Sequence, residues 1–499
     1  MRVPPVAAET ATETSGRVIR GSMTYAAGAV LQRAAPLLLL LLLAYILTPS
    51  EFGQIGLIIA IAAALGTLLS FGLETAIFRG YREESSNTET VRVLVNTVGG
   101  FALLAPIAGA AGIAVIAAPT LASVFDVPAD ALKLGCIAAG VNVAATLVPL
   151  TLMRAQERLR DYLKLTSIQV AVTVGITILF VAVMGWGVTG WMLASALGGL
   201  LLLIRGLAIL HHRWNFEIDL QHLRRALRFG LPLVPHAFAQ WGLAASDRAI
   251  IVASVGSLQA GPYYAAYQLT LPVTLVSIAL AQGSQPVFAD ARTSHRRHND
   301  ITRIATSQAV LVMLAASVVA LVGPPATLLL LPAGYAPAAD YIPWLALGAC
   351  FFGLYLMPMN AIALTAGRTG HVWVITVFAA MANIALNLAL VPQIGAYAAA
   401  VNTAIGYAIL GVGVWAYMRR VCRPPIRYEP RPIAIGAVLI GMACIAATWF
   451  SPSDPLTGVV VRTAILVVLT ASLVALGPLS REARSVLGAI RPASNGLSP

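Results

Sequence analysis

Four charged side chains lie inside long apolar stretches of this sequence, and their chemistry stands out. They are Arg33, Glu74, Asp247 and Arg248. An arginine guanidinium remote from water needs an anion, and its planar fork binds two oxygens of a phosphate or carboxylate at once. A carboxylate in the same surroundings can couple to an ion, act in a gate, or pair with a basic side chain of another helix. These positions predict anion binding, ion coupling or buried ion pairs.

The composition shows what kind of scaffold must hold these charges. Of the 499 residues, 59% are hydrophobic and only 10% are charged, whereas about a quarter of the residues of a soluble domain are charged. The apolar residues also form long blocks, which excludes a disordered chain. The sequence therefore predicts an all-α polytopic membrane protein that uses nearly its whole length to cross the bilayer.

Several other classes of protein are disfavoured. The net charge is +12, but the basic residues lie in short loops between apolar segments, so we expect no nucleic-acid partner. No Gly-rich phosphate loop ending in Gly-Lys-Ser or Gly-Lys-Thr is present. The four cysteines have neither the spacing of metal ligands nor that of a disulfide framework, so we predict no metal and no cofactor. They are Cys136, Cys350, Cys422 and Cys444.

A bilayer span needs about 20 mostly apolar residues, and the sequence contains fourteen such stretches. They are residues 22–47, 52–78, 93–118, 132–153, 163–184, 188–210, 229–253, 260–286, 304–323, 341–366, 371–391, 395–418, 432–450 and 458–478.

The basic residues orient these helices. Of 32 Lys and Arg residues, 28 lie in the termini and in alternate loops, while the other loops carry only Lys133 and Arg462. Because Lys and Arg gather on the cytoplasmic side, we predict a multi-pass protein of the inner (cytoplasmic) membrane with both termini cytoplasmic. The outer loops are short, and the longest runs from Gly323 to Asp340. No outer domain is predicted to house the active site of an enzyme.

Several glycines recur at a nearly constant spacing along the chain. Gly21 and Gly230 are 209 residues apart, and the pairs 208 residues apart are Gly53 and Gly261, Gly187 and Gly395, and Gly198 and Gly406. This spacing predicts duplication of a six-helix unit, with bundles at 22–210 and 229–418, and chance matches between small residues are the alternative. Because six is even, both bundles enter the membrane from the same side, which predicts a parallel arrangement around a V-shaped central cavity.

The remaining segments complete the predicted domain organisation. They are a cytoplasmic tail at 1–21, a cytoplasmic linker at 211–228, a basic cytoplasmic linker at 419–431, two extra transmembrane helices at 432–478 and a cytoplasmic tail at 479–499.

Arg33 is the strongest candidate for binding an anionic substrate. It lies about 12 residues into the first predicted span, or ~18 Å along a helix that rises 1.5 Å per residue, which places it near the bilayer centre. The competing interpretation is a structural ion pair with Glu74 or Asp247.

The other charges have similar alternatives. Asp247 and Arg248 are adjacent, so their side chains point about 100° apart on a helix and need separate partners. They predict a gate or an ion-coupling site, or else bridges between helices. Glu74 lies near the cytoplasmic end of the second predicted span. It is a candidate substrate contact or an interfacial carboxylate near Arg79.

Amide side chains inside the spans are weaker candidates for substrate contact. Gln240 and Asn360 are the two that we select, and Asn383 and Asn387 share one helix face at an i, i+4 spacing. Amides in membrane helices also hydrogen-bond to neighbouring helices without any ligand, and this structural role is the alternative at each position.

Four short motifs resemble those of polysaccharide exporters of the Wzx-like type. Residues 47–53 (LTPSEFG) resemble the "LSPEEYG" turn after their first helix, and residues 153–158 (MRAQER) resemble their "RAQGR" element. Residues 229–233 (FGLPL) with Asp247 and Arg248 resemble "FGLPL…DR", and Gly334 and Tyr335 with Ala338 resemble "YAxA". The resemblance extends over residues 17–420.

The resemblance implies membership of the MOP superfamily (multidrug, oligosaccharidyl-lipid and polysaccharide exporters), which includes the lipid II flippase and multidrug antiporters. It implies a flippase that moves a polyprenyl-pyrophosphate-linked oligosaccharide, the repeat unit of an O-antigen or exopolysaccharide, by alternating access. Arg33 matches, by location, the cavity arginines of such flippases. Membrane lipids, a polysaccharide polymerase and a chain-length regulator are the implied partners. A cation-coupled multidrug or metabolite antiporter is the alternative, and the coupling ion stays open.

Overall fold

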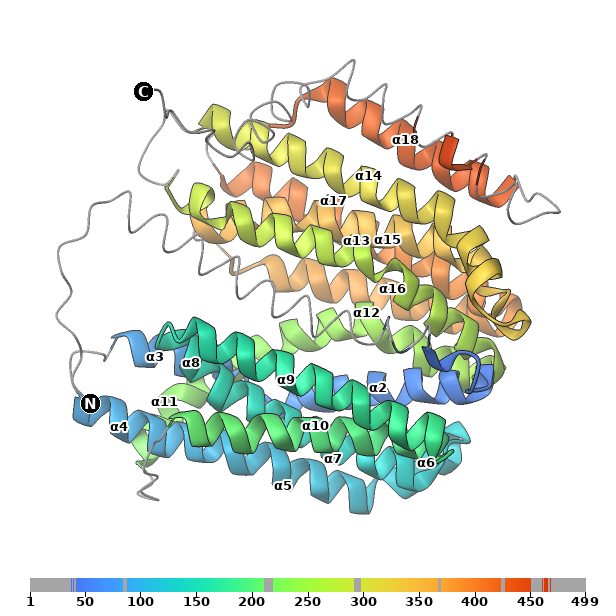
Figure 1. Ribbon diagram of the computed structural model, residues 1–499. Coiled ribbons are helices and arrows are strands. Elements are labelled where there is room, and N and C mark those ends of the chain that lie inside the picture. The colour runs from blue at the N-terminus through green and yellow to red at the C-terminus, as the bar shows by residue number, and fades with distance from the viewer. Residues whose placement is uncertain are drawn as a thin grey trace, which may run out of the picture.

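The computed structural model describes residues 42–83, 88–210, 219–290, 298–366, 369–422 and 427–449, together with Leu37, Leu39 and a few residues from Val460 to Val467. These residues form helices and the turns between them, and no β-strand occurs among them. Figure 1 shows two helical bundles side by side, one with α2 to α10 and the other with α12 to α18. The prediction of an all-α polytopic membrane fold is confirmed.

The first bundle follows the predicted spans closely. Its helices are α2 (Pro49–Leu69), α3 (Leu73–Glu83), α4 (Thr88–Leu94), α5 (Gly100–Ile116), α6 (Ala118–Phe125), α7 (Ala129–Ala145), α8 (Thr151–Ala155), α9 (Leu159–Thr177) and α10 (Gly187–Leu210). Wider π-helical turns at Val95–Gly99 and Thr146–Leu150 join α4 to α5 and α7 to α8. The second of these turns contains Pro149, whose missing N–H disturbs the regular helical ladder.

The second bundle has longer helices. They are α12 (Val234–Val255), α13 (Ser257–Asp290), α14 (His298–Leu330), α15 (Ala338–Asn360), α16 (Val372–Ile394), α17 (Ala396–Val421) and α18 (Pro430–Trp449). Before them, α11 (Leu220–Gly230) contacts α3 of the first bundle. A tight turn at Leu231–Leu233, containing Pro232, separates α11 from α12.

Eleven helices among the described residues are long and apolar enough to cross a membrane. They coincide with eleven of the fourteen predicted spans, and α12, which is not among the eleven, occupies the seventh. The predicted first span lies mostly, and the fourteenth almost entirely, outside the described residues. The total of fourteen and the domain boundaries therefore stay predictions.

The second predicted span ends earlier than expected. Phe71 and Gly72 have φ angles of +49° and +65°, so α2 stops at Leu69 and α3 begins a new helix at Leu73. A Cβ atom at Gly72 would lie 2.6 Å from the carbonyl carbon of Gly230, so only glycine allows this close approach. Our prediction that the span runs to residue 78 is wrong, because the local backbone reverses its hand before the apolar residues end.

The longest predicted outer loop is shorter than expected. We predicted a loop from Gly323 to Asp340, but α14 continues through Pro324 and Pro325 as far as Leu330. The apolar run that follows the prolines extends the helix. This correction leaves even less chain for an outer domain.

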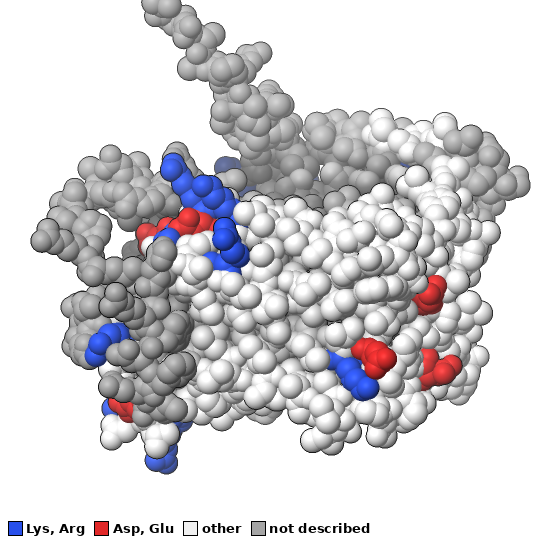
Figure 2. Space-filling view, turned by 60° about the horizontal axis from the view of Figure 1, so that its bottom comes forward, with Lys and Arg blue, Asp and Glu red and all other residues white. Residues whose placement is uncertain are grey.

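The surface of the molecule matches a membrane environment. Figure 2 shows a broad uncharged area, with the visible charged side chains gathered toward the two ends of the helices. Large apolar side chains are widely exposed on the described part of the chain, such as Ile116 at 79% and Val183 at 73%. Exposed apolar area on this scale is unfavourable in water but is satisfied by lipid.

Candidate functional site

The first functional feature is the start of α2, which carries the LTPSEFG motif. Thr48 Oγ1 accepts the backbone N–H of Glu51 at 3.2 Å, and the Glu51 carboxylate accepts the backbone N–H of Thr48 at 2.9 Å. This is a capping box, in which each side chain satisfies a free N–H of the first helical turn. Pro49 stands in the first turn, where its missing N–H costs nothing. The motif thus fixes where α2 begins.

The start of α2 packs against the start of α13 through two glycines that were paired by sequence spacing. A Cβ atom at Gly53 would overlap the carbonyl oxygen of Ser257, and one at Gly261 would overlap that of Pro49. Ser257 follows Pro49 by 208 residues, as Gly261 follows Gly53, so the two contacts are reciprocal. Ser50 Oγ and Ser257 Oγ also lie 2.6 Å apart. The bundles therefore touch backbone to backbone at this end.

A second pair of glycines repeats the same relationship within each bundle. A Cβ atom at Gly187 would lie 2.8 Å from Glu51 Oε1, and one at Gly395 would lie 2.6 Å from Gln259 Oε1. Glu51 and Gln259 are again 208 residues apart. Reciprocal contacts at one offset are what two-fold-related units produce. They support the predicted duplication, which stays a prediction.

Aromatic side chains pack against one another at the interface beside these glycines. The ring of Phe52 contacts those of Trp191, Tyr264 and Tyr335, with centroids 5.2 to 6.1 Å apart. Tyr335 OH donates to the carbonyl oxygen of Leu47 at 3.0 Å. We call residues Pro49, Phe52, Gly53, Ser257, Gly261 and Tyr335 the glycine contact. It joins the bundles at the end that the topology predicts to be outer.

Asp247 lies at the centre of a buried polar cluster in the second bundle. Its side chain is on α12 and is 1% exposed. Tyr263 OH on α13 donates to Asp247 Oδ2, and Thr403 Oγ1 on α17 lies 3.4 Å from the same oxygen. The backbone N–H of Arg248 donates to Oδ1 at 2.7 Å. The carboxylate thus bridges three helices, as the structural alternative predicted, and it is also a buried charge that an ion could neutralise.

Arg248 points to a different set of partners, as expected for its position beside Asp247. Its guanidinium carbon lies 4.3 Å from the ring centroid of Tyr267 and 5.2 Å from that of Tyr264. Such cation–π contacts stabilise a desolvated guanidinium by about 2 kcal/mol. Arg248 Nε is buried and has no hydrogen-bond partner. Within the described part of the chain, Arg248 forms no ion pair with a carboxylate.

The first bundle contains an open cavity of about 550 Å³. Its lining comes from α2, α3, α7, the turn after α7, α9 and α10, with Leu39. Its polar lining residues are Ser70, Glu74, Asn142, Thr146, Gln169, Thr173, Thr177 and Ser195. Apart from Glu74, none of the described lining residues carries a charge.

Two consecutive glycines of α10 make room for polar side chains in this cavity. A Cβ atom at Gly199 would lie 2.8 to 2.9 Å from the amide atoms of Asn142, and one at Gly198 would overlap Thr173 Oγ1. Asn142 Nδ2 donates to the carbonyl oxygen of Ala138 at 2.8 Å, which leaves its amide oxygen for a ligand. Thr173 Oγ1 is buried and has no hydrogen-bond partner.

Glu74 stands at one end of the cavity and forms an ion pair that we did not predict. Its Oε1 lies 2.5 Å from Arg154 Nη1. We expected Arg79 as its neighbour, but the guanidinium of Arg79 lies 5.3 Å from the ring centroid of Phe229. The break after α2 explains the difference, because α3 points Glu74 toward α8. Arg154 belongs to the MRAQER motif, so this motif supplies a counter-ion.

The selected amides form hydrogen bonds with neighbouring helices. Gln240 Nε2 donates to Tyr355 OH at 3.2 Å, and Asn360 Nδ2 donates to the carbonyl oxygen of Ala281 at 2.9 Å. Substrate contact by either residue stays a prediction. Asn383 and Asn387 are hydrogen-bonded to each other at 3.2 Å, as their i, i+4 spacing suggested.

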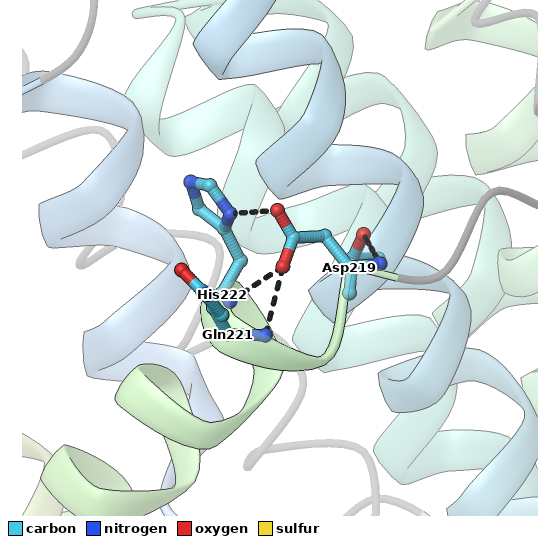
Figure 3. A network of polar contacts seen from close by, with 4 residues as sticks. Asp219, Gln221 and His222 are labelled. Atoms are coloured by element: carbon cyan, nitrogen blue, oxygen red, sulfur yellow. Dashed lines mark hydrogen bonds and ion pairs between the residues drawn. The ribbon is translucent and has the colours of Figure 1, made fainter.

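A network of polar contacts holds the start of α11, the helix that precedes the second bundle (Figure 3). Asp219 caps α11, since its Oδ1 accepts the backbone N–H groups of Gln221 at 2.8 Å and His222 at 3.3 Å. Asp219 Oδ2 lies 2.7 Å from His222 Nδ1. These hydrogen bonds, with that of the His222 side chain first, lower the pKa of Asp219 below 3.8. The backbone N–H of Asp219 donates to Thr97 Oγ1 at 3.1 Å, so the network ties α11 to the first bundle.

The predicted site residues do not form one cluster. Asp247 and Arg248 lie together near the bundle interface, while Glu74 lies in the first bundle and Gln240 and Asn360 face other helices. Arg33 lies outside the described residues. Its roles as an anion site or as the partner of Glu74 or Asp247 stay predictions.

A family model described as polysaccharide biosynthesis protein matches residues 42–340. The chain belongs to this family. Among curated proteins, none matches the sequence. The match covers helices α2 to α10, the glycine contact, and Asp247 with Tyr263, but it ends before Thr403.

Solved structures share the fold at low sequence identity. A lipid II flippase MurJ in an inward-closed conformation has a TM-score of 0.70 at 12% identity, covering 90% of this chain and 98% of that one. An inward-facing multidrug resistance MATE transporter of the MOP superfamily has a TM-score of 0.62 at 12% identity, covering 85% and 95%. An outward-facing MATE transporter, at 14% identity, reaches 0.55, covering 86% and 98%. This member of the polysaccharide biosynthesis family therefore shares its fold with these flippases and transporters.

The sequence analysis missed the cavity residues of the first bundle. Gln169, Thr173 and Thr177 recur every four residues, which places them on one face of α9. Asn142 in α7 and Thr146 just after it have the same spacing. This periodicity could have identified a polar helix face inside the bundle. Alone it is weak evidence, because uncharged polar residues are common in membrane helices.

Proposed function

We propose that this protein is a flippase that moves a polyprenyl-pyrophosphate-linked oligosaccharide across the cytoplasmic membrane, with both termini in the cytoplasm. One observation carries the proposal: a chain of the polysaccharide biosynthesis family has the fold of flippases and transporters. Polysaccharides are assembled from units that are made on lipid carriers and must cross a membrane. The protein moves the unit and leaves its bonds intact, so it is not an enzyme.

The way in which the two bundles meet supports a mechanism of alternating access. They contact each other tightly at the glycine contact, where backbone touches backbone, so this end is closed in the present conformation. The higher TM-score with the inward-facing than with the outward-facing MATE transporter supports this assignment. Opening of the glycine contact, with closure at the other end, would expose the substrate on the outside.

The pyrophosphate needs a cation, and we propose Arg33 for this role. It is a permanently charged fork on the first predicted span, and the span precedes the glycine contact directly. Arg248 is enclosed by tyrosines in this conformation, so its contact with a substrate would require rearrangement of the interface. Asp247 beside it is the group that we propose to couple transport to an ion.

A transport assay with purified protein in liposomes tests the proposal. The substrate is the lipid-linked oligosaccharide extracted from the cells that make the protein, and its appearance on the opposite leaflet is measured with an impermeant oxidant of sugars. We expect Arg33→Ala to abolish transport and Arg33→Lys to restore part of it, because an ammonium keeps the charge but loses the two-pronged geometry.

Two measurements keep this test decisive. If Arg33 belongs instead to a buried ion pair, Arg33→Ala would destabilise the fold by about 3–5 kcal/mol, which thermal unfolding would reveal. If the wild type exports an aromatic cation such as ethidium and does not move the lipid-linked oligosaccharide, the antiporter alternative holds. A polysaccharide polymerase and a chain-length regulator are the proposed protein partners, and co-purification from the native membrane tests for them.

A further inference from the structure

We propose that the cavity of the first bundle binds the sugar part of the substrate, while the pyrophosphate stays outside it. This inference rests on the proposed function and assigns a place to one chemical part of the substrate. The cavity has about 550 Å³, within the range of about 300–1,000 Å³ typical of small-molecule sites.

The charges of the lining select against both an anion and a cation. Among the described lining residues none is a lysine or arginine, so a pyrophosphate would find there none of the basic groups that it needs. Glu74 is the only charged residue that the described part of the chain contributes to the lining, and its ion pair with Arg154 offsets its charge. A cationic drug would therefore also find no net negative site. What remains is a neutral ligand that is rich in hydrogen-bonding groups.

The uncharged polar groups of the lining suit such a ligand. The amide oxygen of Asn142 is left over from the hydrogen bonds of its Nδ2. Thr173 Oγ1 is buried without a partner, and an unsatisfied buried hydroxyl costs about 1–3 kcal/mol. A sugar hydroxyl both donates and accepts, so it satisfies either group. Trp191 adds a large ring to the lining.

The second bundle does not repeat the glycine and the amide that shape this cavity. The residues 208 positions after Asn142 and Gly199 are Cys350 and Tyr407. Tyr407 is buried, and its ring packs edge-to-face on Phe352 with centroids 5.6 Å apart. Glycine and an amide in one bundle thus correspond to a bulky ring and a thiol in the other, so these polar features are specific to the first bundle at the paired positions.

Binding measurements on the purified full-length protein in nanodiscs test this assignment. The probes are the lipid-linked oligosaccharide extracted from the source cells and undecaprenyl pyrophosphate without sugar. We expect Asn142→Ala and Thr173→Val each to weaken binding of the first probe by about three- to tenfold, the value of one neutral hydrogen bond. Neither substitution should change binding of the sugar-free probe.

Gly199→Ala provides a steric version of the test, and Gly175→Ala is its matched control. A Cβ atom at Gly199 would displace the Asn142 amide, whereas one at Gly175 on α9 would meet nothing within 4 Å. We expect Gly199→Ala to weaken oligosaccharide binding and Gly175→Ala to leave it unchanged. Thr173→Val keeps the shape of the side chain, so it remains informative if Gly199→Ala fails to fold.

Other results would overturn the assignment. Equal loss for both probes, or no loss for either, would mean that the cavity does not hold the sugar. A wild type that binds both probes equally tightly would also refute it, although the flippase proposal would stand. A wild type that binds neither probe but binds ethidium would overturn the flippase proposal itself, and the sugar site with it.

Discussion

Gly261→Ala should open the glycine contact, because the structure leaves no space for a side chain there. A Cβ atom at Gly261 would overlap the carbonyl oxygen of Pro49 and lie 2.6 Å from its carbonyl carbon, whereas ordinary contacts begin at 3.4 Å. The atoms that would clash are backbone atoms, so no side-chain rotation can relieve the overlap. The starts of α2 and α13 must therefore move apart.

The expected magnitude follows from the cost of overpacking. Inserting a methyl group into a tightly packed site costs about 1–3 kcal/mol. In alternating access this strain acts on the form closed at the glycine contact and is relieved when the contact opens. The ratio of closed to open forms should therefore fall by about 5- to 150-fold.

Cross-linking measures this ratio directly. Ser50→Cys and Ser257→Cys are introduced together after the four native cysteines have been replaced, since the two Oγ atoms lie 2.6 Å apart. We expect oxidation to join the pair quickly in the parent and much more slowly with Gly261→Ala. Gly283→Ala is the matched control on the same helix, because a Cβ atom there meets nothing within 4 Å.

Two outcomes would refute this reasoning. Equal cross-linking rates with and without Gly261→Ala would mean that the bundles tolerate the methyl group without separating. A variant that no longer accumulates in the membrane would mean that the contact belongs to the folded core of both conformations and does not act as a gate.

Three further predictions concern single residues. Asp247→Asn removes the buried charge with little change of volume, and we expect transport to lose its dependence on a proton or sodium gradient; unchanged ion dependence in liposomes would exclude a coupling role. Glu74→Gln and Arg154→Gln should show a coupling energy below about 1 kcal/mol in a double-mutant cycle of thermal unfolding, because the Glu74 and Arg154 side chains are 46% and 38% exposed. The His222 hydrogen bond lowers the pKa of Asp219. The ionised Asp219 side chain therefore stabilises the start of α11 above about pH 3.8, and this stabilisation is lost as the pH falls through the lowered pKa. The protection of the α11 amides from hydrogen exchange, relative to the intrinsic exchange rate at each pH, should show this loss in the wild type. In Asp219→Ala this protection should be low at every pH.

Much of the fold could be predicted because it depends on composition along the chain. Apolar stretches located the spans without any knowledge of tertiary contacts, and glycine spacing paired Gly53 with Gly261 before their contact was known. The boundary errors arose where backbone geometry overrides hydropathy. Phe71 and Gly72 end α2 within an apolar run, and α14 continues beyond Pro324 because apolar residues follow it.

The partners of the charged residues could not be predicted, because they depend on how helices distant in sequence pack. Nothing near Asp247 in the chain indicates that Thr403 will lie beside it, and Glu74 pairs with Arg154 rather than with its near neighbour Arg79. Spacing on one helix restricts which side chains share a face, but it does not say which face turns inward. The spacing of polar residues along α9 showed that they share one face of the helix. It did not show that this face lines a cavity.

The two bundles differ at the positions that our proposals assign to the sugar and to the coupling ion. The first bundle has glycine at position 199 and an amide at Asn142 beside a polar cavity in which Glu74 is the one charged lining residue among those described. At the corresponding place the second bundle is filled by Tyr407, and it holds instead a buried carboxylate at Asp247. A site for a neutral ligand and a site for an ion would compete if they shared one cavity, since each would need a different charge in its lining. Our proposals place the two sites in separate bundles, which removes this conflict.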